Sequence, residues 1–129
     1  MDDPFHIDRF VEAQAGGVYE TALAELRTGQ KRSHWMWFIF PQHRDLGHSA
    51  TAKFFGLSGL EEARAYAAHP LLGPRLRESA AAVLEHLGET SAETILGPVD
   101  AMKLRSSMDI FAEAVPDEPV FGEVRRAAG

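Results

Sequence analysis

Apolar side chains recur at helical spacing along three long stretches of the chain. Residues 18–28, 72–87 and 99–114 place apolar residues three or four positions apart, which is the pattern of an amphipathic helix. A glycine or a proline stands shortly after each stretch, as expected where a helix ends. We therefore predict helices over these three ranges.

Shorter helices are predicted around the three long ones. Their ranges are 7–14, 49–55, 58–68 and 90–96, whereas residues 120–126 are expected to pack only as a terminal turn. No two segments show the paired alternation of a sheet. The pattern predicts an all-α fold, a single multihelical domain over residues 1–129 with about six to eight short and medium helices and no significant sheet.

The most apolar stretch is the aromatic run at residues 34–40, within the sequence KRSHWMWFIFPQ at residues 31–42. Nearly every position in it is apolar, so periodicity does not separate helix from strand. Aromatic content and Ile39 favour a strand, but no second strand is available to pair with it. We predict a buried helix with Ser33 as its N-cap, ended by Pro41.

Composition narrows the class of protein. The 129 residues include no cysteine, which excludes disulfides, thiol catalysis and cysteine–zinc sites. The longest apolar run is far shorter than the roughly 20 residues of a membrane-spanning helix. The acidic start, MDDPFHIDRF, lacks the basic and apolar regions of a signal peptide. We expect a cytoplasmic protein with no membrane association.

Charge is unevenly distributed. The net charge is −6, yet residues 26–54 carry +4 and the rest of the chain carries −10. A local positive patch on an acidic protein favours anionic partners. The alternative is that these basic residues are only solvent-exposed side chains that keep the loops around an apolar helix soluble.

The residues in and around this basic window suggest an anion site. Lysine and arginine give charge-assisted donors to phosphate or carboxylate, and an indole face can stack on a base. The alternative is an aromatic core with solvated cations at a helix start, where cations oppose the helix dipole unless an anion is near. The candidate ligand-binding residues are Lys31, Arg32, His34, Trp35, Gln42 and Lys103.

Two further groups have weaker patterns. Lys103 and Ser107 are four residues apart, with Ser106 between them, and a lysine beside a serine can form a base and nucleophile pair. The alternative is that these are ordinary polar residues on the solvent-exposed face of a helix, which have the same spacing. His43, Asp45 and His48 offer possible metal ligands, but no fourth ligand accompanies them, so we predict no metal site.

Residues spread along most of the chain match the pattern of a known family. They are Phe10, Gln14, Tyr19, Ala22, Leu23, Gly29, Lys31, residues 33–42, Leu46, Gly47, Ser49, Glu62, Ala63, Ala65, Tyr66, His69, Pro70, Leu72, Gly73, Arg75, Leu76, Gly97, Asp100, Lys103, Leu104, residues 106–108 and Phe111. On these residues the chain resembles the domain of unknown function 1810, whose members are small bacterial proteins sometimes mislabelled calpastatin. The resemblance extends over about residues 5–121 and implies a multihelical fold and no established activity. Members usually continue past Phe121 with a further segment, where this chain has GEVRRAAG, so we expect it to be shortened at its C-terminus.

These observations lead to one functional expectation and two alternatives. We expect a domain that binds a small anionic or nucleotide-like ligand in a cationic-aromatic pocket around residues 31–42. The first alternative is a hydrolase or transferase acting on such a ligand, with His34 as acid-base and Lys103 as anion clamp. The second is a protein-interaction module with an exposed aromatic patch. No cofactor and no nucleic-acid partner are expected, and the sequence indicates no particular oligomeric state.

Overall fold

The computed structural model describes residues 3–129, and nearly all regular structure in this range is helical. Residues 3–129 contain no β-strand, only one isolated bridge between His43 and Leu57. The all-α prediction is therefore confirmed. The elements are α1 (Asp8–Ala13), α2 (Val18–Thr28), α3 (Met36–Ile39), the 3-10 turn η1 (Arg44–Leu46), α4 (Ala50–Phe54), α5 (Leu60–Ala68), α6 (Leu72–Leu87), α7 (Ala92–Leu96), α8 (Pro98–Ala114) and α9 (Pro119–Ala128).

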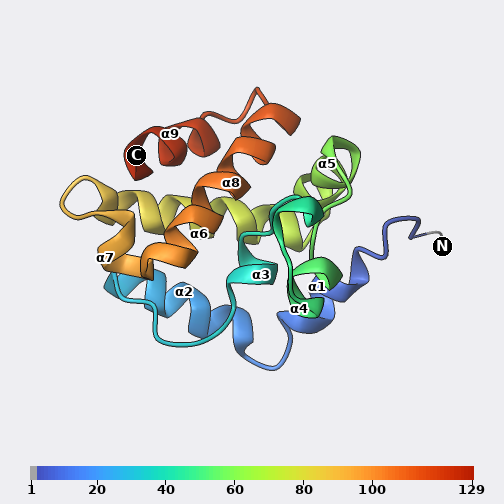
Figure 1. Ribbon diagram of the computed structural model, residues 1–129, viewed down its shortest axis with the longest axis horizontal. Coiled ribbons are helices and arrows are strands. Elements are labelled where there is room, and N and C mark those ends of the chain that lie inside the picture. Colours follow the sequence, from blue (N-terminus) through green and yellow to red (C-terminus); the bar gives the residue numbers. More distant parts are fainter. Residues whose placement is uncertain (1–2) are drawn as a thin grey trace.

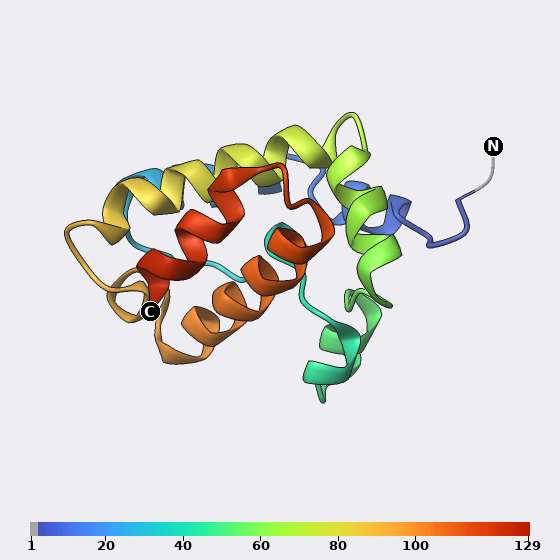
Figure 2. The same cartoon turned by 90° about the horizontal axis from the view of Figure 1, so that it is seen from above.

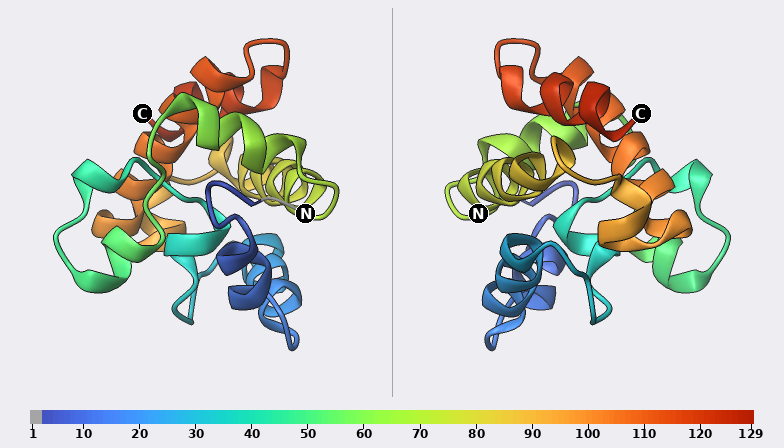
Figure 3. Two further views of the ribbon diagram at one scale, coloured as in Figure 1. Left: turned by 90° about the vertical axis from the view of Figure 1, so that its right-hand side faces the viewer. Right: turned by 90° about the vertical axis from the view of Figure 1, so that its left-hand side faces the viewer.

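The two longest helices, α6 and α8, organise the packing (Figure 1). Helix α6 packs against α2, α5 and α9, and α8 packs against α5, α7 and α9. Figure 2 shows α9 between α6 and α8, and Figure 3 shows the N-terminal helices on the opposite side of α6 from α9. No helix within residues 3–129 combines the length and the apolarity needed to cross a bilayer.

The predicted core faces are buried. Leu76, Leu104, Met108 and Phe111 are at most 1% exposed, and Leu84 is half-buried at the edge of the same core. A chain of aromatic rings runs through this core from Tyr66 to Phe111 and on to Phe121. The apolar stripes of α6 and α8 therefore meet as their spacing predicts.

The aromatic run forms much less helix than expected. Helix α3 spans only four residues, and its N-cap position is Trp35, with no side-chain cap. The prediction of Ser33 as N-cap is wrong, because its hydroxyl donates to the Glu25 carboxylate instead. A four-residue helix also has too small a dipole to act on Lys31, five residues before its start.

The C-terminal segment differs from the expected turn, since it forms the ten-residue helix α9. Phe121, Val124 and Ala128 are buried along one face of α9 against α6 and α8. Their spacing of three and four positions is helical, and packing supplies the stability that so short a helix lacks alone.

The segment that contains η1 and α4 is fastened to the rest of the molecule at its base. The Leu57 N–H donates to the Gln42 carbonyl at 2.8 Å, and the Arg44 N–H donates to the Leu57 carbonyl at 2.9 Å. Gly56 passes so close to Arg44 that an added Cβ would lie 2.3 Å from the Arg44 Cα. The buried Arg9 guanidinium donates to the carbonyls of Phe54 and Gly56 at 2.7 and 3.0 Å. These contacts hold residues 42–57 in one position beside α8.

Candidate functional site

The Glu25 side chain on α2 fixes the segment before α3. Its carboxylate accepts hydrogen bonds from the backbone N–H groups of Arg32 and Ser33 at 2.7 and 3.0 Å. It also accepts from the Ser33 hydroxyl at 2.6 Å and from the Trp35 indole N–H at 2.9 Å. Burial alone would raise the Glu25 pKa, but these four hydrogen bonds outweigh it and lower the pKa to about 2.

The other end of the aromatic run is held by a buried polar network. The Phe38 carbonyl, left free by the single-turn helix, accepts from the Gln14 amide and from the Tyr66 hydroxyl, each at 2.9 Å. Arg75 donates to the Gln14 side-chain oxygen at 3.2 Å. Burial raises the pKa of Tyr66 above its ordinary value, so its hydroxyl stays protonated as a donor. With both ends fixed, the indoles of the run have defined positions.

Two lysines meet at one aspartate beside these indoles. Lys31 Nζ lies 2.9 Å from one Asp100 carboxylate oxygen, and Lys103 Nζ lies 3.5 Å from the other. Lys31 Nζ is also 5.1 Å from the Trp35 ring centroid, and Lys103 Nζ is 4.5 Å from that of Trp37, both within cation–π range. We call these five residues the lysine–tryptophan cluster.

The lysine–tryptophan cluster sits where the segment before α3 crosses the first turns of α8. The Lys31 backbone N–H donates to the Ile95 carbonyl of α7 at 2.8 Å, which brings its side chain to Asp100. Asp100 and Lys103 are three residues apart on α8 and therefore share a face. Trp35 is buried, whereas Trp37 is half-buried beneath Lys103.

The structure brings together only some of the predicted site residues. Lys31, Trp35 and Lys103 belong to the lysine–tryptophan cluster, but Arg32 is exposed and donates to the Gln30 amide oxygen at 3.1 Å. Gln42 is half-buried at the base of the segment with η1.

His34 is exposed and lines a separate hollow of about 300 Å³ between the start of α2 and residues 33–35. The hollow is also lined by the glycine pair before α2, by Thr21 and by Trp35 of the cluster, but by neither lysine of the cluster. The expected single pocket around residues 31–42 is therefore divided between two places, one with Lys31 and one with His34.

Sequence reasoning missed Asp100 and Trp37 as members of the site. The signal for Asp100 was present, because its spacing to Lys103 places both on one face of the predicted helix. Trp37 had no such signal, since nearly every residue of the run is apolar and nothing in the pattern shows which ring faces a cation.

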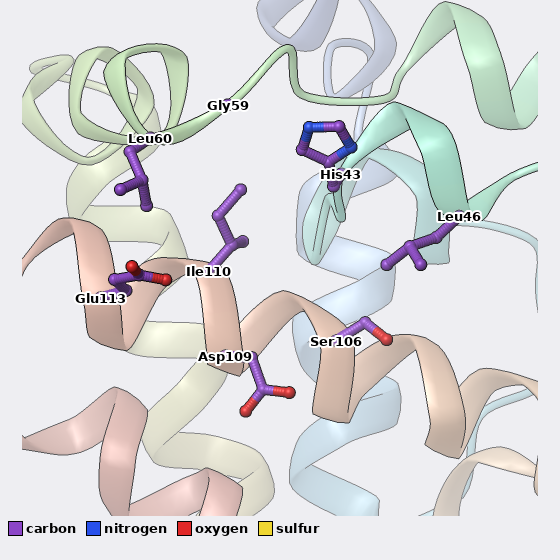
Figure 4. Close-up of a pocket in the computed structure, with 8 residues that line it drawn as sticks. All are labelled: His43, Leu46, Gly59, Leu60, Ser106, Asp109, Ile110 and Glu113. Carbon is purple, nitrogen blue, oxygen red and sulfur yellow. The ribbon is translucent and has the colours of Figure 1, made fainter.

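A wider hollow of about 550 Å³ lies between α8 and the segment from η1 to the start of α5 (Figure 4). We call it the α8 groove. Leu46, Leu60 and Ile110 give it apolar walls, and the sticks of Leu60 and Ile110 point toward one another in Figure 4. Its polar lining comes from His43 and from Ser106, Asp109 and Glu113 on α8.

The polar groups of the α8 groove do not form a catalytic triad. His43 Nδ1 accepts the backbone N–H of Asp45 at 3.1 Å, which in the neutral ring leaves the proton on Nε2, and it lies 3.6 Å from the Asp45 carboxylate. A serine–histidine–aspartate arrangement needs the opposite, with Nδ1 donating to the carboxylate and Nε2 free to accept. In the groove, His43 therefore acts as a hydrogen-bond donor.

The two weaker sequence groups also lack catalytic or metal-binding geometry. Lys103 Nζ contacts Asp100 and Trp37, while the Ser107 hydroxyl is buried with no hydrogen-bond partner within residues 3–129. No lysine–serine pair forms. Over the same range, no group of three or more histidine or carboxylate side chains is arranged to hold a metal ion, and this includes His43, Asp45 and His48.

Comparison with known proteins agrees with the sequence resemblance. Residues 4–127 match the family described as protein of unknown function DUF1810, and the chain belongs to that family. A crystal structure of a conserved hypothetical protein from Mycobacterium tuberculosis matches at 51% identity and a TM-score of 0.90, over 95% of this chain and 86% of that one. No curated protein matches.

Proposed function

We propose that this member of the DUF1810 family binds a small anionic ligand at the lysine–tryptophan cluster. The observation that carries the proposal is the charge balance: two ammonium groups share one carboxylate, that of Asp100. The cluster therefore carries one uncompensated positive charge. The Lys31 and Lys103 side chains are only 10% and 20% exposed, so water screens that charge less than it does at an open surface.

The chemistry of the ammonium groups fits a phosphate or carboxylate ligand. Each lysine has three N–H donors, and its contact with Asp100 occupies only part of that capacity. Charge-assisted hydrogen bonds from the remaining donors to an anionic oxygen are stronger than neutral ones. A nucleotide-like ligand adds a ring that can stack on the exposed part of Trp37.

The two alternative functions have less support. His34, the acid-base group of the enzyme alternative, lines a hollow that neither Lys31 nor Lys103 lines. The interaction-module alternative needs an exposed aromatic patch, whereas Trp35 is 1% exposed and Trp37 is half-covered by Lys103. Anion binding is supported by the two ammonium groups that already lie side by side at Asp100.

The test uses variants that shift the charge balance in opposite directions. Phosphate and adenosine 5′-monophosphate are titrated into the protein, with tryptophan fluorescence and the thermal midpoint as readouts, since a bound ligand raises that midpoint. Lys103→Gln is expected to weaken binding about tenfold, equivalent to about 1.4 kcal/mol. Asp100→Asn removes the competing carboxylate and is expected to strengthen binding. High salt should weaken binding by screening.

Arg32→Gln is the matched control, because Arg32 carries the same charge nearby but lies outside the lysine–tryptophan cluster. The affinity of Arg32→Gln for phosphate and for adenosine 5′-monophosphate should equal that of the parent protein. Equal losses in Lys103→Gln and Arg32→Gln would mean that only the general field of the basic segment attracts anions. Weaker binding in a folded Asp100→Asn variant would identify the cluster as a structural clamp and refute the proposal.

A further inference from the structure

The α8 groove has a charge opposite to that of the lysine–tryptophan cluster. Asp109 and Glu113 line it one helical turn apart on α8, and no lysine or arginine lines the groove. Arg125 of α9 is the ion-pair partner of Asp109, at 2.7 Å, and Asp109 points away from the groove in Figure 4. Glu113 pairs with no cation within residues 3–129, so its carboxylate remains available for a ligand.

The rest of the lining suits a ligand with an apolar body. Ile110 stands between Ser106 and Glu113 on one face of α8, at positions i, i+4 and i+7. Leu46 is 54% exposed at the rim, where a bound ligand would cover part of its apolar surface. The volume of about 550 Å³ falls within the range of small-molecule sites.

We infer that the α8 groove binds a small organic cation, an amine with an apolar body. The ammonium group pairs with the Glu113 carboxylate, and the Ser106 hydroxyl, two helical turns away, is placed for a polar group at the other end of the ligand. The apolar body lies against Leu46, Leu60 and Ile110. His43 presents its Nε2–H as a donor, which disfavours a cation at that end and donates to a polar oxygen of the ligand.

The inference is independent of anion binding at the lysine–tryptophan cluster. The residues that line the groove do not include Lys31, Lys103 or Asp100. The net charge of −6 also favours the approach of cations over the molecule as a whole. A failure at one site therefore leaves the other unaffected.

The experiment compares three probes of nearly equal size that differ in charge: 2-phenylethylamine, 2-phenylethanol and 3-phenylpropanoate. Each is titrated into the isotope-labelled protein and followed by two-dimensional NMR. The amine is expected to shift the backbone signals of Leu60, Ser106 and Ile110 in a saturable way. The alcohol should bind at least tenfold more weakly, a difference of about 1.4 kcal/mol, and the carboxylate should not bind.

Two variants test the role of the carboxylates in opposite directions. Glu113→Gln is expected to weaken amine binding about two- to fivefold, because Glu113 is exposed and solvent screens its charge. Arg125→Gln removes the cation that neutralises Asp109, and the more negative field beside the groove is expected to strengthen amine binding severalfold. The control is Glu123→Gln, because Glu123 is exposed on α9 and does not line the groove. Phosphate titrations of all three variants should match the parent.

Several outcomes would overturn the inference. Equal affinity for the amine and the alcohol would leave only an apolar contact, without charge recognition. Equal losses in Glu113→Gln and Glu123→Gln would assign the effect to net charge. Signal shifts confined to residues outside the α8 groove would place the amine elsewhere on the molecule.

Discussion

Glu25 offers the sharpest test of how the candidate site is built, because one carboxylate holds the whole segment before α3. Glu25→Gln keeps the size of the side chain and an oxygen that can accept three of the four hydrogen bonds. The charge is lost, and the new amide group faces the Ser33 hydroxyl. The substitution therefore changes electrostatics with little change in packing.

The expected cost follows from the hydrogen bonds. Bonds to a charged acceptor contribute about 1.5–3 kcal/mol each and neutral ones about 0.5–1.5, before solvent screening at a partly exposed group. Screening and the retained neutral bonds reduce the difference, so we expect Glu25→Gln to lower the free energy of unfolding by about 1–3 kcal/mol at pH 7. Urea denaturation followed by tryptophan fluorescence measures this directly.

The unfolding free energy lost in Glu25→Gln should also depend on pH. The Glu25 pKa is about 2 in the folded protein, below the ordinary value of 4.5. A lowered pKa stabilises the fold above pH 4.5, and this contribution is lost as the pH falls toward 2. The difference in unfolding free energy between the parent and Glu25→Gln should therefore narrow across that window.

Glu20→Gln is the control for this pH experiment, since Glu20 lies on the same helix but is exposed. Its unfolding free energy should stay within about 0.5 kcal/mol of the parent at every pH, as for ordinary surface changes. If both variants lose the same stability, Glu25 does not organise the segment. A constant difference between pH 7 and pH 2.5 would refute the lowered pKa.

Two further predictions concern the scaffold. Leu104 is fully buried on α8, so Leu104→Ala should lower the free energy of unfolding, measured by urea denaturation, by roughly 2–5 kcal/mol. A loss below about 0.5 kcal/mol would mean that this face of α8 is exposed to solvent. Arg9 and Glu62 form a buried ion pair at 2.7 Å, so Arg9→Met should cost about 3–5 kcal/mol, and Arg9→Met with Glu62→Leu should recover part of that loss. A double variant no more stable than Arg9→Met would contradict this account of the pair.

The long helices were predictable because their information is local. Residues 18–28, 72–87 and 99–114 each repeat apolar side chains over several turns, and α2, α6 and α8 follow those ranges within one residue. The short α9 was underestimated, although Phe121 and Val124 already had helical spacing. Its stability comes from α6 and α8, which are remote in sequence.

The conformation of the aromatic run could not be predicted from its own residues. Its shape depends on Glu25, Gln14 and Tyr66, which lie up to 28 residues away in sequence and bond to its two ends. An uninterrupted apolar pattern does not indicate such partners, so the run was assigned a longer helix than α3. The same anchors explain why Lys31 and His34, three residues apart, lie in different places.

The position of Asp100 decides which lysine can be replaced to test ligand binding without also changing the stability of the fold. Lys31 has two structural contacts, its backbone N–H to Ile95 and its ammonium group to Asp100, and the latter pair is only 10% and 18% exposed. Removing the Lys31 side chain would leave Asp100 with the longer contact to Lys103, so lost stability and lost affinity would be mixed. Lys103 lies on α8, so its own backbone is held by the helix. When the Lys103 charge is removed, Asp100 keeps its shorter contact with Lys31. A loss of anion affinity in Lys103→Gln with an unchanged unfolding free energy therefore reports on binding, which a lysine serving only the fold would not produce.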